Sequence, residues 1–143
     1  MSLKGGLGFR RLKIFMHTKI KELSAKRIKY LIEKQIPFYE GNKTYLKGLR
    51  EELKEVEEEI KENNSVYLED ELGDVFWDYL CFLHSLENEG KITSADSVFK
   101  RCYKKFGERV GFDGNGGHNW QEVKDKQKQE LKIEHNKLYN NDR

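Results

Sequence analysis

The stretches LKGLREELKEVEEEI (residues 46–60) and LEDELGDVFWDYLCFLHSL (residues 68–86) decide the fold of this chain. Apolar residues recur in both at every third or fourth position, which is the period of an amphipathic α-helix. At the edge of its apolar stripe, each stretch also carries two acidic residues three positions apart: Glu52 and Glu55, then Glu71 and Asp74. Because only a short turn separates the two stretches, we expect antiparallel neighbouring helices whose acidic edges face each other.

Carboxylates that converge beside a core predict a metal site. They repel one another and lose hydration, which costs free energy unless a cation or a proton compensates. Oxygen ligands without a neighbouring Cys or His favour a hard cation, Mg²⁺ or else Mn²⁺, over Zn²⁺. Gly73 stands between the members of the second pair, and we expect it to permit close backbone approach. A di-iron site is less favoured because it needs Glu-x-x-His, and neither pair ends in His.

The composition predicts an all-α fold. The chain has 143 residues, a single Pro and 36% hydrophobic residues, which suffices for the helical core of one domain. We expect residues 16–143 to form a bundle of four to five helices with a polar C-terminal tail, completed by oligomerisation, and residues 1–15 to be a leader or expression-derived segment. Expected helices cover about 17–34, 44–62, 66–88 and 93–110, with a loop at 111–119 and a helix-permissive tail from Trp120.

Charge and hydropathy argue against two classes of function, nucleic acid binding and membrane insertion. Residues 1–15 contain four basic residues and no acid, which leaves 23 basic against 25 acidic groups in the remainder. Such a slightly acidic body does not favour binding to a nucleic acid polymer. No segment approaches the ~20 apolar residues of a membrane span. Cys81 and Cys102 lack metal-like spacing, so we expect reduced packing residues in a cytoplasmic protein.

The acidic motifs resemble those of the MazG-type all-α nucleoside triphosphate pyrophosphohydrolases. LREELKEVEEEI (residues 49–60) is similar to the family's Glu-Glu-x-x-Glu helix, and EDELGDVFWDYL (residues 69–80) is similar to its Glu-Leu-Gly-Asp helix. Downstream, KFGER (residues 105–109) is similar to the family's Lys-x-x-x-Arg, and WQEVK (residues 120–124) to its Trp-x-x-x-Lys. The chain departs from the family pattern at Glu59, where many relatives carry alanine, and at residues 67–70, where many carry a basic residue. The extra acids Glu59, Asp70 and Asp78 could bind a second metal or provide a base.

The resemblance implies a Mg²⁺-dependent hydrolysis, with Mn²⁺ as a substitute, of (d)NTPs at the α-phosphorus to (d)NMP and pyrophosphate. It places the metal on four residues that are also catalytic: Glu52, Glu55, Glu71 and Asp74. It implies phosphate contacts from Lys105, Arg109 and Lys124, and a substrate-closing position for Trp120. The implied role is nucleotide-pool house-cleaning by a homodimer or homotetramer.

Simpler interpretations compete at several positions. Lys105 and Arg109 lie on a helix crowded with other basic residues, where a solvated face is the ordinary arrangement. Trp120 could simply anchor the tail. Four aromatic residues near the acidic helices could stack on a nucleobase, although such residues belong more often to cores: Phe38, Tyr39, Tyr45 and Trp77. The alternative function is a non-enzymatic helical module whose charged faces bind a protein partner.

Overall fold

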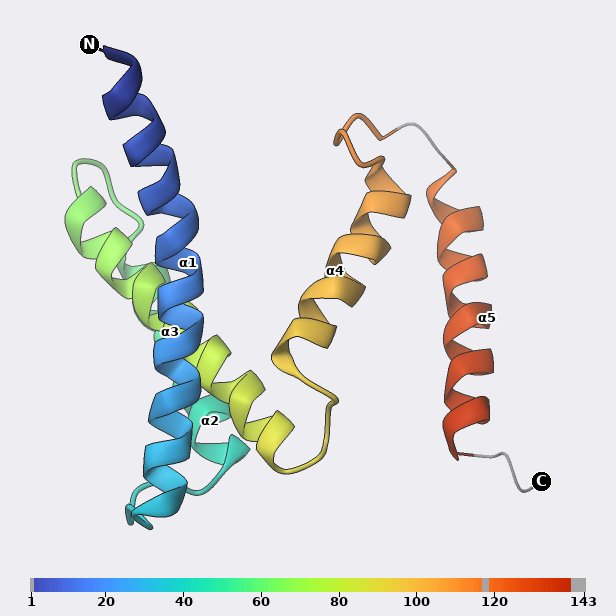
Figure 1. Cartoon of the computed structure of the whole chain (residues 1–143), viewed down its shortest axis with the longest axis horizontal. Coiled ribbons are helices and arrows are strands. Elements are labelled where there is room, and N and C mark those ends of the chain that lie inside the picture. The colour runs from blue at the N-terminus through green and yellow to red at the C-terminus, as the bar shows by residue number, and fades with distance from the viewer. Residues whose placement is uncertain (1, 117–118, 140–143) are drawn as a thin grey trace. The chain divides into compact units, whose positions relative to one another are not determined.

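The computed structural model describes residues 2–116 and 119–139, and these residues contain helices and no strand (Figure 1). The five helices are α1 (Ser2–Glu33), α2 (Asn42–Glu59), α3 (Ser65–Asn88), α4 (Ala95–Val110) and α5 (Trp120–Tyr139). The all-α prediction is confirmed. Among the described residues, no helix combines the length and apolar character needed to cross a membrane. The chain divides into two compact units, Met1–Ala95 and Asp96–Arg143.

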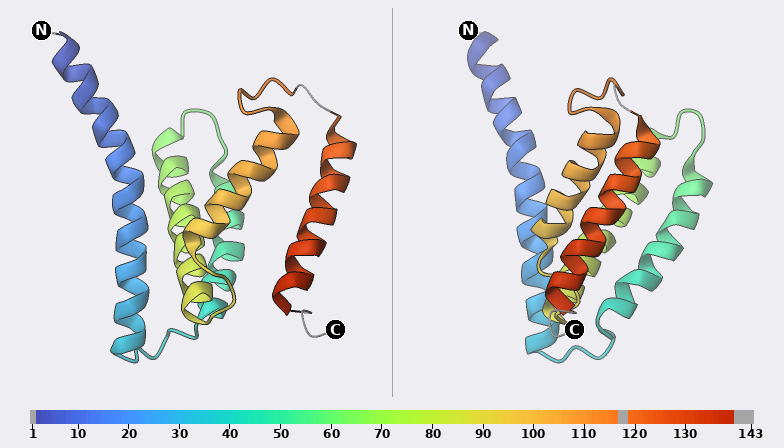
Figure 2. Two further views of the ribbon diagram at one scale, coloured as in Figure 1. Left: turned by 45° about the vertical axis from the view of Figure 1, so that its right-hand side comes forward. Right: turned by 90° about the vertical axis from the view of Figure 1, so that its right-hand side faces the viewer.

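In the first unit, α2 and α3 run antiparallel along each other, and α1 packs against α3 (Figure 2). The core forms where the lower half of α1 meets these helices. Its buried members are Ile28, Leu31, Tyr45 and Cys81, with Ile32, Ile36, Tyr39, Trp77 and Phe82 packed around them. Burial of these side chains provides the main stabilisation of the unit, because removing apolar surface from water is the dominant favourable term in folding.

Side chains at both ends of α2 fix its register against α3. At its C-terminal end, Asn64 Nδ2 donates hydrogen bonds to the Glu59 carbonyl oxygen (2.8 Å) and to the Glu59 carboxylate (2.6 Å). At its N-terminal end, the Glu89 carboxylate accepts from the Asn42 backbone N–H (3.1 Å) and from Asn42 Nδ2 (2.7 Å). Because Asn64 engages the Glu59 carbonyl, α2 ends three residues earlier than the predicted position 62.

The close approach between α2 and α3 occurs at Gly48. A Cβ atom at Gly48 would lie 2.5 Å from Asp78 Oδ2, whereas a Cβ atom at Gly73 would meet nothing within 4 Å. The prediction that Gly73 permits close approach is therefore wrong, because Gly73 lies on an exposed side of α3. Gly48 instead lets the Asp78 carboxylate lie against α2.

The first helix begins at Ser2, and not near His17 as predicted. No proline interrupts the segment, and its glycines lower helix propensity without preventing a helix. At the other end, Gln35 takes a left-handed conformation (φ 49°), and the Ile36 N–H donates to the Leu31 carbonyl at 3.1 Å. Pro37 then prevents any continuation of the helix. The assignment of residues 1–15 as a leader stays a prediction.

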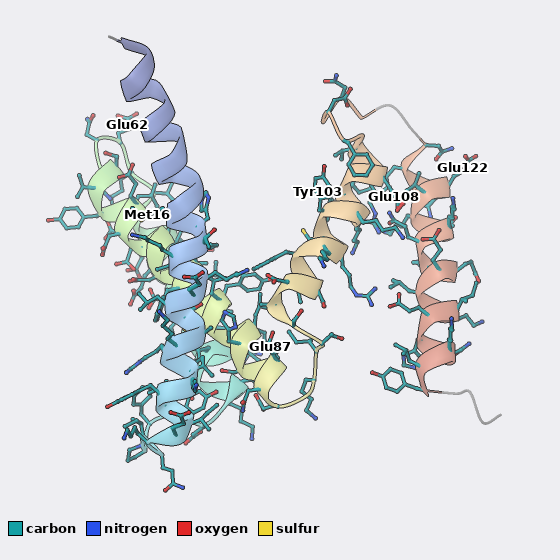
Figure 3. The ribbon with its side chains drawn as sticks, viewed as in Figure 1. Met16, Glu62, Glu87, Tyr103, Glu108 and Glu122 are labelled. Atoms are coloured by element: carbon teal, nitrogen blue, oxygen red, sulfur yellow. The ribbon has the colours of Figure 1, made fainter. Side chains whose placement is uncertain are left out.

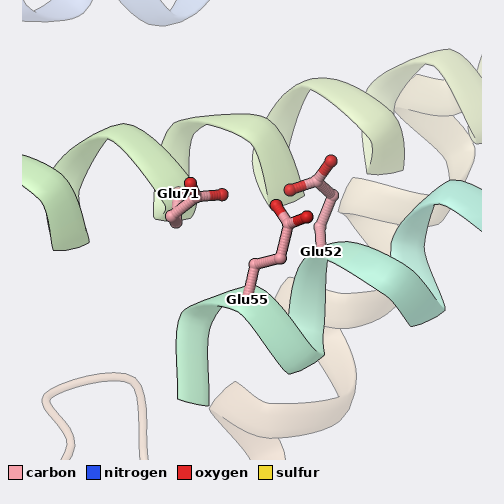
Figure 4. Close-up of side chains that lie close together, drawn as sticks. All are labelled: Glu52, Glu55 and Glu71. Carbon is pink, nitrogen blue, oxygen red and sulfur yellow. The ribbon is translucent and has the colours of Figure 1, made fainter. Parts of the chain in front are cut away.

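The apolar stripes of α2 and α3 are only partly covered in the first unit. Leu53 and Ile60 of α2 are 55% and 65% exposed, and Leu72 of α3 is 49% exposed. The apolar stripes that the sequence marks are thus only partly covered within one chain. On α2, Glu52 and Glu55 are the side chains that point toward α3 (Figure 4). Because Leu53 follows Glu52 directly, helix geometry turns it away from this edge.

In the second unit, α4 and α5 run antiparallel and are joined by polar side chains (Figure 1). Arg101 donates two hydrogen bonds to the Glu134 carboxylate, and Lys104 Nζ lies 3.7 Å from Glu130. Tyr103 and Glu108 lie on opposite sides of α4, with Glu108 toward α5 (Figure 3). The predicted loop at 111–119 lies partly outside the described residues, since 117 and 118 are not described.

The two cysteines differ in their surroundings. Cys81 is fully buried and belongs to the core of the first unit. Cys102 is exposed. The prediction of a packing role is confirmed for Cys81 and wrong for Cys102, which lines the open hollow between α4 and α5.

Gly48 of α2 and Gly73 of α3 offer a matched test of the α2–α3 contact. We expect Gly73→Ala to raise the free energy of unfolding by about 0.5–1 kcal/mol, because alanine has the higher helix propensity. We expect the free energy of unfolding of Gly48→Ala to lie at least about 1 kcal/mol below that of Gly73→Ala, because the new methyl group displaces the Asp78 carboxylate. Urea unfolding of both variants measures the difference, and equal stabilisation by both would contradict the contact.

Candidate metal centre

Three carboxylates meet between α2 and α3. Glu52 and Glu55 extend from α2 toward α3, and Glu71 extends from α3 toward them (Figure 4). One carboxylate oxygen from each lies within 4.8 Å of the others. The spacing of Glu52 and Glu55 puts both on one face of α2, as the sequence predicted. The prediction that the acidic edges of the two helices face each other is thereby confirmed for these three residues.

Asp74 belongs to a second group that shares Glu71 with the first. Oxygen atoms of Asp70, Glu71 and Asp74 also lie within 4.8 Å of one another. Asp74 is therefore linked to Glu52 and Glu55 through Glu71. Asp70 was not among the predicted site residues. The sequence marked it only as an extra acid, and its position four residues before Asp74 puts both on neighbouring turns of one helix face.

Crowding of the carboxylates raises their proton affinity. Burial raises the pKa of Glu52 to about 7, and the hydrogen bond with Glu55, the Glu55 charge and the Asp74 charge act in the same direction. Burial also raises the pKa of Glu71, with further contributions from Glu55. A raised pKa for a carboxyl group beside other carboxyl groups means that the site favours bound positive charge, either protons or a cation.

Two oxygen atoms of this group lack partners. Among the described residues, Oε2 of Glu52 and Oε2 of Glu71 are buried and make no hydrogen bond. Buried acceptors are normally satisfied, so each unpaired oxygen carries a free-energy cost. A divalent cation would satisfy both oxygens and remove the repulsion. An all-oxygen donor set suits a hard ion such as Mg²⁺, Mn²⁺ or Ca²⁺.

The predicted phosphate-binding residues come together in the second unit. Lys105, Arg109 and Lys124 line one hollow of about 720 Å³ between α4 and α5. The Arg109 guanidinium lies over the Trp120 ring, with Cζ 5.3 Å from the ring centroid. Trp120 thus contacts one of the predicted phosphate ligands. Its predicted role in closing over a substrate stays a prediction.

The aromatic residues near the acidic helices are mostly structural. Tyr45 is buried in the core, and Trp77 packs against it. The Tyr39 hydroxyl donates to Ser85 Oγ at 2.8 Å, inside the first unit. Phe38 is exposed. A packing role is therefore the better interpretation for three of the four aromatic residues considered for base stacking.

The chain belongs to the family of the MazG nucleotide pyrophosphohydrolase domain, whose model matches residues 40–111. That range contains both acidic groups, together with Lys105 and Arg109. Membership implies nucleotide pyrophosphohydrolase activity, a nucleotide substrate and the use of a divalent metal. Trp120 and Lys124 lie beyond the matched range. Neither a curated protein nor a solved structure matched the chain.

The raised pKa of Glu52 predicts an unusual pH dependence in the metal-free protein. The folded state holds a proton that the unfolded state releases above the ordinary value of 4.5, so stability present at low pH is lost as pH rises through about 7. Allowing for solvent screening, we expect the free energy of unfolding to fall by about 1–2 kcal/mol from this group. Urea unfolding in EDTA across this pH range measures the fall.

Glu52→Gln should lack this fall, because its side chain does not titrate. Glu58→Gln, an exposed change on the same helix, should keep it. Added Mg²⁺ should stabilise the wild-type protein more above pH ~7 than below, because the ion competes with protons for the carboxylates. An identical pH dependence in wild type and Glu52→Gln would contradict the account.

Proposed function

We propose that this protein is a Mg²⁺-dependent nucleoside triphosphate pyrophosphohydrolase, which converts (d)NTPs to (d)NMP and pyrophosphate by attack of water at the α-phosphorus. The metal ligands and catalytic residues in this proposal are Glu52, Glu55, Glu71 and Asp74. The observation that carries it is the meeting of carboxylates from α2 and α3, with two buried oxygens unpaired, in a chain of the MazG family.

The proposed metal ligands come from two helices. Glu52 and Glu55 approach from α2 and Glu71 from α3, so an ion held by all three has ligands on two helices. Asp74 adds a further oxygen beside Glu71. Bound Mg²⁺ supplies charge neutralisation at the phosphate oxygens and lowers the pKa of water. Mn²⁺ prefers a similar oxygen ligand set and is the expected substitute.

The second unit supplies the phosphate-binding residues in this proposal. Arg109 presents a planar fork suited to two oxygens of one phosphate, while Lys105 and Lys124 act as point charges. All three line the same hollow, which supports a common ligand. Their charge stabilises the pyrophosphate leaving group, on which negative charge accumulates during phosphoryl transfer. Trp120, stacked on Arg109, closes over the bound phosphates.

The proposed role is removal of surplus or non-canonical nucleotides in the cytoplasm by a homodimer or homotetramer. The uncovered stripe on α2 and α3 supports assembly, since large exposed apolar surfaces usually mark interaction sites. A second exposed apolar feature is a hollow of about 580 Å³ on α1 and α3, which is lined in part by Met16, Leu23 and Phe76. A second copy of the chain would cover such surface.

The nucleotide assay tests the reaction directly. The full chain is incubated with a panel of canonical and modified (d)NTPs and Mg²⁺ in isotopically labelled water. We expect monophosphate and pyrophosphate as products, label in the monophosphate, and loss of turnover in EDTA. Glu71→Gln should lower kcat/KM at least about 100-fold with helix content retained, because a neutral amide is a poorer metal ligand.

Glu58→Gln is the matched control for that assay, since Glu58 is an exposed acid of α2 outside both acidic groups. It should retain wild-type turnover. Absence of turnover with every nucleotide would favour the rival function, a non-enzymatic interaction module. That rival also predicts that Glu71→Gln leaves the behaviour of the protein unchanged.

Light scattering tests the proposed assembly. We expect the wild-type chain to have the mass of a dimer or tetramer, and Leu53→Glu to shift it toward the monomer, because a charge would be buried in the apolar interface. Leu138→Glu changes an exposed leucine of α5 and should leave the mass unchanged. A fully active wild-type monomer would contradict assembly as a requirement of the site.

A further inference from the structure

Gln127 is the only residue of α5 that is buried, at 8% exposure. A buried amide is costly unless both of its ends find partners. Gln127 Nε2 donates to the Lys105 carbonyl oxygen at 3.1 Å, and Gln127 Oε1 accepts from Arg109 Nε at 2.9 Å. The amide orientation follows from chemistry, because a carbonyl can only accept and Arg Nε can only donate.

These contacts restrict the Arg109 side chain on several sides. Gln127 holds its Nε, and the Trp120 and Phe106 rings lie near its guanidinium, with centroids 5.3 and 5.7 Å from Cζ. Cation–π contacts of this kind favour one placement of the planar group. Because Nε is engaged, the edge formed by the two Nη groups is the part of the fork left for an anion.

We propose that Gln127 is a positioning residue, which holds the Arg109 fork ready for a phosphate of the nucleotide. The inference rests on the proposed function, and it adds a residue of α5, a helix beyond the range that the family model matches. An arginine side chain that is free to rotate must be ordered when the ligand binds, which weakens binding. Gln127 removes this cost before the phosphate arrives.

A competing role for Gln127 is docking of α5 alone, through its hydrogen bond to the Lys105 carbonyl. The two roles differ in their dependence on Arg109. A positioning residue has nothing to act on when the Nε group is absent, whereas a docking residue matters whatever stands at position 109. A double-mutant cycle separates them.

The cycle uses Gln127→Met, which keeps the side-chain length without the amide, in the wild-type and Arg109→Lys backgrounds. Inorganic pyrophosphate is the probe, with its affinity measured by calorimetry on the full chain and its inhibition constant measured in the nucleotide assay. In the wild-type background we expect Gln127→Met to weaken pyrophosphate binding and to raise KM by about three- to tenfold. kcat should change less than KM.

In the Arg109→Lys background, Gln127→Met should change pyrophosphate affinity by less than about twofold, because lysine has no Nε–H at the position that Gln127 holds. Gln129→Met is the control, since Gln129 is an exposed glutamine of the same helix, and it should match wild type. If Gln127→Met loses helix content by circular dichroism, Gln127→Asn replaces it, because the shorter amide stays polar but does not reach Arg109.

Equal weakening in both backgrounds, or none in the wild-type background, would overturn the inference. Turnover by the wild type with no effect of Gln127→Met would refute the positioning role alone. Pyrophosphate binding without turnover of any nucleotide would refute the proposed function, while the cycle would still decide the role of Gln127. Wild-type protein that neither hydrolyses a nucleotide nor binds pyrophosphate would refute both.

Discussion

Mutual repulsion among carboxylates at the α2–α3 contact is the constraint on which the first unit depends. Glu52 and Glu55 face Glu71 across the contact, where apolar side chains would ordinarily interdigitate. Without compensation, burial and like charge oppose ionisation, which is why the pKa of Glu52 rises to about 7. A proton or a cation bound from solution therefore stabilises the helix pair, because it reduces the repulsion among these carboxylates.

This arrangement determines where the apolar surface goes. Because α2 turns its acidic edge toward α3, leucines such as Leu53 lie at the side of the pair and remain exposed. Gly48 admits the Asp78 carboxylate at the same contact, which extends the acidic edge further along α3. The contact between α2 and α3 is thus lined in part by acidic side chains, where two packed helices usually place apolar ones. The same arrangement accounts for both features on which the proposals rest, namely the carboxylates between the helices and the exposed apolar side chains beside them.

The sequence could predict the helices and the acidic edges, because periodicity fixes which side chains share a helix face. It could not show which residues of α2 and α3 come closest, so Gly73 was credited with the contact made at Gly48. Asp70 was predicted only as an extra acid, because one acidic residue in a charged segment carries little information alone, and the structure groups it with Glu71 and Asp74. The predicted start of α1 was wrong, because a segment with a weak apolar pattern can still continue a helix.

Binding of Mn²⁺ in the absence of nucleotide tests the central claim most directly. Mn²⁺ loses its free-ion paramagnetic resonance signal when protein ligands bind it, so titration of the metal-free chain measures the site itself. We predict that Mn²⁺ binds saturably and that Mg²⁺ displaces it. The Glu52→Gln and Glu71→Gln variants should not bind Mn²⁺, whereas Glu58→Gln should bind it as the wild type does. Weak binding that does not saturate and is the same in all four proteins would contradict a metal centre between α2 and α3.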